Sequence, residues 1–177
     1  MDRILALDVA TRTGWATDSA DCRGCGTLDL SVGVPRRGRH PGLILLNARR
    51  DLGKLIERTR PDLVVFERPF VRGAGTRLLW ALCGVVELVA AEHGLATLEL
   101  SVSQARKAAT GRATLTKEEA VAWATIAGWA PLDDNAADAV VMLSAYRALM
   151  APRPTAEILD LDRIRVPATR RSTRKAA

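Results

Sequence analysis

The sequence predicts an α/β fold in which a mixed five-stranded sheet, an antiparallel meander followed by parallel strands, is flanked by helices. Two features of the residue pattern predict it. Short strand-like segments follow one another near the N-terminus before any helical spacing appears. Helical and strand-like segments then alternate, and helical spacing dominates from residue 102 onward. This order is typical of a mixed sheet covered by helices.

The first strand is expected at residues 3–7, an apolar run that ends at Asp8. Residues 11–14 have the composition of a turn, which leads into a second short strand at residues 15–17. Glycines punctuate a third strand-like segment at residues 24–28. Asp8 therefore lies where the first strand of the predicted meander ends.

A helix is expected after the basic loop of residues 34–41, because the apolar residues between 45 and 56 have helical spacing. Pro61 predicts where this helix ends. The apolar run that follows is typical of a strand buried on both faces of a sheet, and it closes with Glu67. The remaining expected elements are a helix at 78–92, a strand at 95–100, and helices at 102–109, 118–127 and 135–150.

Residues 1–150 are expected to form one domain, since 177 residues with 48% hydrophobic content suffice for a single core. Residues 151–177 lack the apolar periodicity of a packed element. They contain seven Arg or Lys against three acids, which supplies +4 of the net charge of +6. We expect a basic, flexible tail that binds DNA or a protein partner; the alternative is a tail that only solubilises the chain.

Three cysteines, an odd number, favour a reducing compartment, and Cys22 and Cys25 are interpreted as hairpin residues rather than as a redox or zinc pair. The longest apolar stretch, residues 78–91, contains Glu87 and is shorter than the roughly 20 residues that span a bilayer. The sequence therefore predicts a cytoplasmic protein without a membrane segment. Its positive net charge favours a polyanionic partner.

Acidic side chains lie at the ends of three predicted elements. Asp8 follows the first strand, Glu67 ends the buried strand, and Asp133, Asp134 and Asp138 open the last helix. Asp134 and Asp138 are four residues apart, a spacing that places both side chains on one helical face. Oxygen ligands without His or Cys suit Mg²⁺ or Mn²⁺ better than zinc. The alternatives are solvated carboxylates and, for Asp133 or Asp134, a helix N-cap.

Four groups of segments carry a resemblance to a known family. They are Ile4-Leu5-Ala6-Leu7-Asp8 with Thr13-Gly14-Trp15-Ala16, residues 61–67, residues 104–111 with 116–121, and residues 134–139. They resemble the RuvC-type Holliday junction resolvases of the RNase H-like superfamily, over nearly the whole body from residue 4 to about residue 150. The resemblance implies an RNase H-like fold and a structure-selective endodeoxyribonuclease that cuts branched DNA by two-metal-ion hydrolysis.

The resemblance also implies a metal site. Asp8, Glu67, Asp134 and Asp138 would hold two Mg²⁺ ions in the active site, and Mn²⁺ would substitute for them. In the family the last two acids are three residues apart, but Asn135 occupies the earlier of these positions here. Asp134, one residue before it, is expected to substitute, which leaves open whether Asp134 or Asn135 completes the site.

Contacts with DNA are implied in the same way. Phe70 matches an aromatic residue that wedges against bases of the junction, and Arg106, Lys107 and Lys117 match basic residues near the scissile phosphate. Lys117 is the member of this set that we also expect to act in catalysis. A homodimer is implied as well, because two subunits would present two sites to a four-way DNA junction.

Other functions stay open at this point. One is a non-catalytic protein that binds branched DNA, which the uncharged Asn135 would favour. Another is an RNase H-like nuclease with a different nucleic-acid substrate, such as RNA ends or flaps. A third is a sugar-kinase-like nucleotide-binding domain, since residues 7–11 also resemble the first phosphate-facing strand of that fold.

Overall fold

A computed structural model describes residues 2–18, 22–35, 40–69 and 76–151. Its centre is a five-stranded sheet in the order β3-β2-β1-β4-β5. The first three strands along the chain pair antiparallel, whereas β4 pairs parallel with both β1 and β5. The strands are β1 Ile4–Asp8, β2 Arg12–Asp18, β3 Arg23–Asp29, β4 Leu63–Glu67 and β5 Ala96–Leu100. This arrangement confirms the predicted mixed sheet.

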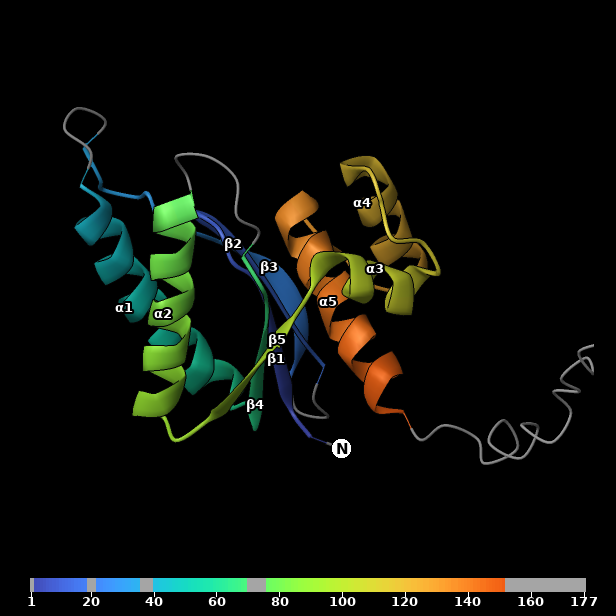
Figure 1. Ribbon diagram of the computed structural model, residues 1–177, viewed down its shortest axis with the longest axis horizontal. Helices are drawn as coiled ribbons and strands as arrows, with labels where there is room; N and C mark the ends of the chain where they lie inside the picture. The colour runs from blue at the N-terminus through green and yellow to red at the C-terminus, as the bar shows by residue number, and fades with distance from the viewer. Residues whose placement is uncertain (1, 19–21, 36–39, 70–75, 152–177) are drawn as a thin grey trace, which may run out of the picture.

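Helices form a layer on each face of this sheet (Figure 1). One layer consists of α1 and α2, and the other of α3, α4 and α5. Each layer encloses its own apolar cluster against the sheet, so the sheet is buried on both faces. The helices are α1 Pro41–Thr59, α2 Thr76–Glu92, α3 Val102–Thr110, α4 Lys117–Ile126 and α5 Asp134–Met150.

The boundaries of the helices agree with the expected segments to within a few residues, because the local signals are strong. Pro41 stands at the start of α1, and Arg60, just before Pro61, ends it in the left-handed region at φ 45°. Thr116 and Glu119 form a reciprocal capping box at the start of α4. Asp133 caps α5 by accepting a hydrogen bond from the Ala136 N–H.

The turn predicted at residues 11–14 is wrong for residues 12–14, which already belong to β2. The chain reverses earlier, and the Thr13 hydroxyl closes the reversal by donating to the Ala10 carbonyl at 2.6 Å. Gly14 is therefore a strand residue rather than a turn residue. Its role is to allow a close approach of α5, as described below.

The two parallel strands β1 and β4 bring their carboxyl ends to the same edge of the sheet. Leu7 of β1 is level with Phe66 of β4, so the next residues, Asp8 and Glu67, follow side by side. Side chains alternate between the two faces of a strand. Ala6 contacts the cluster under α5, and Asp8 continues that alternation onto the same face.

Some predictions fall on residues outside the described ranges: Phe70, residues 36–39 of the basic loop, and residues 152–177 of the tail. Cys25 lies in β3 of the hairpin, as expected, and Cys25 and Cys83 are free thiols. In the part of the chain that the structure describes, no helix has both the length and the apolar character needed to cross a bilayer.

Candidate active site

Asp8 is the most deeply placed carboxylate of the sheet edge. Burial, together with the neighbouring carboxylates of Glu67 and Asp138, raises its pKa to about 8. Arg106 acts in the opposite direction. A buried carboxylate with two acidic neighbours lacks sufficient compensating positive charge, so it is held partly protonated near neutral pH.

Glu67 shares this environment from the end of β4. Burial, opposed by Arg106 and assisted by the Asp138 carboxylate, raises its pKa to about 7. Asp8 and Glu67 therefore both retain protons at a pH where ordinary carboxylates are fully ionised. Two such side chains, held adjacent by parallel strands, make a site that favours a strong positive charge.

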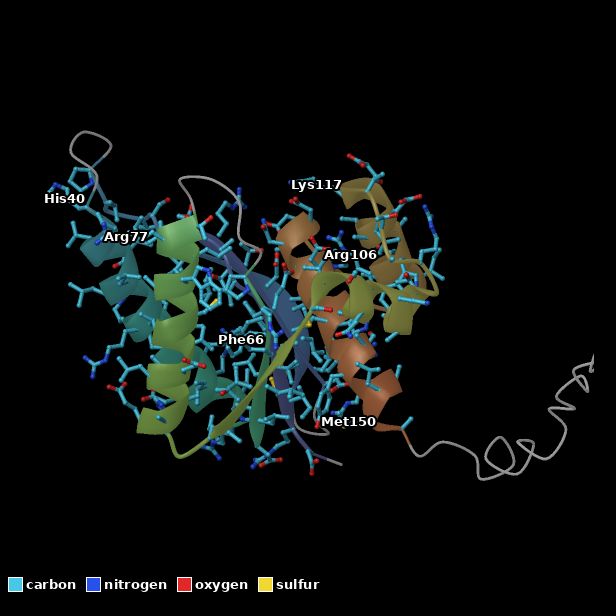
Figure 2. All side chains as sticks on the ribbon, viewed as in Figure 1. His40, Phe66, Arg77, Arg106, Lys117 and Met150 are labelled. Atoms are coloured by element: carbon cyan, nitrogen blue, oxygen red, sulfur yellow. The ribbon has the colours of Figure 1, made fainter. Side chains whose placement is uncertain are left out.

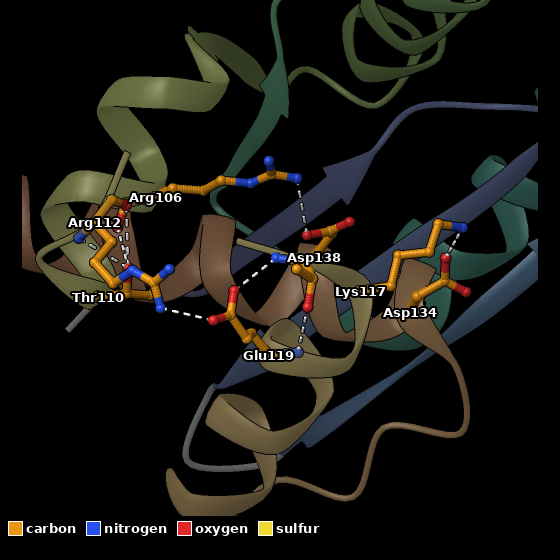
Figure 3. Close-up of polar contacts among 8 residues, drawn as sticks. Arg106, Thr110, Arg112, Lys117, Glu119, Asp134 and Asp138 are labelled. Carbon is orange, nitrogen blue, oxygen red and sulfur yellow. Dashed lines mark hydrogen bonds and ion pairs between the residues drawn. The ribbon is translucent and has the colours of Figure 1, made fainter. Parts of the chain in front are cut away.

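Asp138 approaches these two residues from above the sheet, on α5. Burial raises its pKa, and the guanidinium of Arg106, on α3, lowers it. Arg106 Nη2 lies 3.4 Å from Asp138 Oδ1, and both side chains are about one quarter exposed (Figure 3). Arg106 is therefore the cation that partly neutralises the three acids Asp8, Glu67 and Asp138, which we call the acidic edge.

Asp134 lies one turn before Asp138 but has a different partner. It forms an ion pair with Lys117 at the start of α4 (Figure 3), and this hydrogen bond lowers its pKa. Lys117 is 76% exposed, whereas Asp134 is 29% exposed. Asn135 is engaged elsewhere, in a hydrogen bond to Asp133. Of Asp134 and Asn135, Asp134 is therefore the residue that acts on the acidic edge. Its negative charge contributes to the raised pKa of Asp8.

The predicted basic residues do not all reach the acidic edge. Arg106 and Lys117 lie in the α3–α5 layer, where they hold Asp138 and Asp134 (Figures 2 and 3). Lys107 is exposed on α3, and among the described residues no carboxylate lies within ion-pair distance of it. Adjacent helical residues point in directions about 100° apart, which explains why Lys107 and Arg106 differ.

The donor set of the acidic edge suits a hard divalent cation, since it offers only carboxylate oxygens. The raised pKa values of Asp8 and Glu67 agree with this, because a dication would supply the missing positive charge. As placed, however, no three His, Cys, Asp or Glu side chains within the described ranges converge on one coordination point. The carboxylates would have to turn toward an ion, and Arg106 would have to leave Asp138.

Comparisons with known proteins show where this arrangement belongs. The chain is 34% identical over 121 residues to a crossover junction endodeoxyribonuclease RuvC of Akkermansia muciniphila, an alignment covering 66% of this chain and 72% of the relative. It is 30% identical over 145 residues to the RuvC of a Synechococcus species, covering 79% of this chain and 94% of the relative. The chain belongs to the RuvC family. No family model matches it.

Solved RuvC structures share the fold. Thermus thermophilus RuvC superposes with a TM-score of 0.63 at 18% identity, covering 88% of this chain and 96% of that protein. The same enzyme in complex with a Holliday junction substrate gives the same TM-score at 15% identity and the same coverage. The predicted RNase H-like fold and the predicted resemblance to RuvC are both confirmed.

Sequence reasoning missed the role of Gly14 in this RuvC-family chain. A Cβ atom on Gly14 would lie 1.9 Å from the Asn135 carbonyl oxygen, so only glycine lets the start of α5 rest on β2. It also missed that Thr27 and Arg12 hold Asp133. The Thr13-Gly14 pair was visible as part of the family motif, but the sequence alone does not show which helix would lie on it.

Proposed function

We propose that this RuvC-family chain is a Holliday junction resolvase, a structure-selective endodeoxyribonuclease that cuts branched DNA by metal-dependent phosphodiester hydrolysis. The observation that carries the proposal is that Asp8, Glu67 and Asp138 lie near one another at one edge of the sheet, with Arg106 beside them. The Thermus thermophilus relative, solved with a Holliday junction substrate, supports branched DNA as the substrate class.

The metal would be Mg²⁺, with Mn²⁺ as a substitute and two ions in each site. Asp8, Glu67, Asp138 and Asp134 would hold the ions, since the charges of the other three acids all act on Asp8. When bound, such ions would stabilise both the attacking water and the leaving oxygen of a phosphodiester.

The chain's own side chains prepare and orient this chemistry. Asp8 and Glu67 have to lose their protons before they can act as ligands, so their raised pKa values favour activity at neutral to alkaline pH. Arg106 of α3 and Lys117 of α4 would contact a phosphate bound at the acidic edge, because they already pair with Asp138 and Asp134. Lys107 would contact the DNA backbone beyond the site, and every such contact makes binding salt-dependent.

Two further DNA contacts are part of the proposal although they lie outside the described residues. Phe70 follows Glu67 by three residues in the sequence, and it would wedge against bases at the junction. The basic tail of residues 151–177 would add non-specific affinity for DNA or bind a protein partner. The body of residues 1–150 would then supply all of the chemistry.

A homodimer would present two acidic edges to one four-way junction. The outer face of α2 offers an apolar surface for it, because Trp80 is 47% exposed and Leu88 is 50% exposed. Gly84 lies between them, one helical turn from each, and is exposed, so a second helix could approach closely there. We define Trp80, Gly84 and Leu88 as the α2 stripe.

A synthetic four-way junction, a flap, a duplex and an RNA–DNA hybrid of the same sequence, incubated in Mg²⁺ and run on a denaturing gel, test the proposal. Paired symmetric nicks on the junction alone are expected. Selective cutting of the flap or the hybrid would show another RNase H-like nuclease. Junction binding without cleavage in Mg²⁺ or Mn²⁺ would instead show a non-catalytic binder, which the uncharged Asn135 and the Lys117–Asp134 ion pair would favour.

A further inference from the structure

The carboxylate of Asp133 joins three elements of the fold. Its Oδ1 accepts hydrogen bonds from the Ala136 N–H at 3.0 Å and from the Thr27 hydroxyl at 2.6 Å. Its Oδ2 accepts from Arg12 Nη2 at 2.9 Å. Ala136 belongs to α5, Thr27 to β3 and Arg12 to β2. Both oxygens of Asp133 are therefore occupied by donors of the protein itself.

The hydrogen bonds of Asp133 also keep it charged. Burial acts to raise its pKa, but the bonds from Thr27 and Ala136 and the nearby Arg12 guanidinium hold that pKa below its usual range. Asp133 thus behaves unlike the acids of the acidic edge, whose pKa values are raised. The difference has two causes: Asp133 has hydrogen-bond donors and a guanidinium beside it, whereas Asp8 and Glu67 are more deeply buried and have acidic neighbours.

The position of Asp133 relative to the acidic edge follows from the strand register. Thr27 is level with Gly14, and Gly14 is level with Asp8, so these residues form one row across β3, β2 and β1. The start of α5 runs along this row: Asp133 bonds to Thr27, and the Asn135 carbonyl lies against Gly14. One turn further on, Asp138 meets Asp8 and Arg106.

We propose that Asp133 is a positioning residue, which fastens the first turn of α5 to the β2–β3 hairpin and thereby sets how closely Asp134 and Asp138 approach Asp8. This inference rests on the proposed function of the acidic edge as a metal site. Gly14 permits the close approach of α5, and Asp133 holds the helix in it. Both carboxylate oxygens of Asp133 accept hydrogen bonds from the protein, so its role is to position α5 rather than to bind an ion.

Mn²⁺ binding to the full-length, DNA-free protein, measured by calorimetry, tests the inference. Asp133→Ala should weaken Mn²⁺ binding about 10-fold or more, the scale seen when a residue that orients metal ligands is lost. Thr27→Val, which removes one hydrogen bond two strands away from Asp8, should weaken it about fivefold. Asp133→Asn should recover most of the affinity, because asparagine caps a helix as well as aspartate does.

Asn47→Ala is the matched control, since it removes two hydrogen bonds, to the carbonyls of Leu30 and Val32, on the opposite face of the sheet. It should lower stability without changing Mn²⁺ affinity. Under single turnover, Asp133→Ala should slow junction cleavage while leaving junction affinity unchanged, because the residue acts through the metal ligands. If Asp133→Ala does not fold, Thr27→Val decides the question.

Two outcomes would overturn the inference while leaving the proposed function intact. One is wild-type Mn²⁺ affinity in both Asp133→Ala and Thr27→Val. The other is an Asp133→Asn variant as defective as Asp133→Ala beside an unaffected Thr27→Val, which would make Asp133 a direct ligand. A wild-type protein that binds no Mn²⁺ and cuts no junction would overturn the proposed function together with this inference.

Discussion

The guanidinium of Arg106 lies 3.4 Å from the carboxylate of Asp138. It therefore occupies a carboxylate that a metal ion would need as a ligand. Arg106 also lowers the pKa values of Asp8 and Glu67. In the metal-free protein it therefore supplies part of the positive charge that the acidic edge requires. The same side chain is one of those expected near the scissile phosphate, so metal binding and release of Arg106 toward DNA would be coupled.

This coupling predicts opposite effects of Arg106→Gln on two ligands. Mn²⁺ should bind several-fold more tightly, because a competing cation is gone, while junction affinity should fall by about 1.5–3 kcal/mol, as for other hydrogen bonds to charged groups. Lys107→Gln is the control on the same helix: it should weaken junction binding and leave Mn²⁺ affinity unchanged. Calorimetry and fluorescence anisotropy measure the two affinities, and weaker Mn²⁺ binding by Arg106→Gln would contradict the coupling.

Asp8 gives the metal-free protein a stability that depends on pH. Its pKa is raised in the folded state to about 8 from the usual value of 3.8, so between these values the folded state binds more protons than the unfolded state. Stability from this group is therefore present at low pH and is lost as the pH rises toward 8. Glu67, with a pKa of about 7, acts in the same direction.

Asp8→Asn should consequently stabilise the metal-free protein, and more at pH 8.5 than at pH 5.5. We expect a gain of at least about 1 kcal/mol at the higher pH, equivalent to roughly 2–4 °C in Tm for a domain of this size. Thermal unfolding in EDTA measures it. Added Mn²⁺ should raise the Tm of the wild type but not of the variant. A variant less stable than the wild type at pH 8.5 would show that burial and the acidic neighbours do not destabilise the charged form of Asp8.

Gly14→Ala should damage both the fold and the site. The new Cβ would lie 1.9 Å from the Asn135 carbonyl, so α5 would have to move away from β2. Overpacking of this kind costs about 1–3 kcal/mol or more, and Mn²⁺ affinity should fall with it. Gly53→Ala in the middle of α1 is the control, because the new Cβ would meet only His93 at 3.8 Å. This substitution should stabilise the protein by about 0.5–1 kcal/mol, since alanine favours a helix more than glycine does. Urea unfolding of both variants measures the difference.

The α2 stripe predicts a dimer that a single charge would break. Trp80→Glu should shift the protein from dimer to monomer in sedimentation experiments, because a buried unpaired charge is costly. Leu46→Glu changes a residue of α1 that is 62% exposed, and it should leave the dimer intact. A monomeric wild type, or equal dissociation by both variants, would contradict an interface on α2.

Most of the fold follows from the sequence because its signals are local. The start of α1 at Pro41, the capping box at Thr116 and the buried run ending in Glu67 each depend on neighbouring residues. Gly14 is the instructive exception. Glycine usually indicates a turn, but here it lies within β2 because a helix from the far end of the chain rests on it.

The candidate site, like the fold, is predicted by the sequence only in part. The sequence predicts Asp8, Glu67 and Asp138, because each lies at the end of an element or near a helix start. It does not predict the partners of the neighbouring acids, since Asp133 and Asp134 look equivalent in the sequence. Only the fold shows that Asp133 bonds to β2 and β3 whereas Asp134 pairs with Lys117.

The acidic edge is tested most directly by the initial rate at which a four-way junction is nicked in Mg²⁺ by the wild type, Asp8→Asn and Asp62→Asn. Asp62 pairs with Arg3 before β4 begins, so Asp62→Asn makes the same chemical change away from the site. We predict symmetric nicking by the wild type and by Asp62→Asn, and none by Asp8→Asn despite unchanged junction binding. Nicking by Asp8→Asn at the wild-type rate would show that the chemistry does not depend on this edge of the sheet.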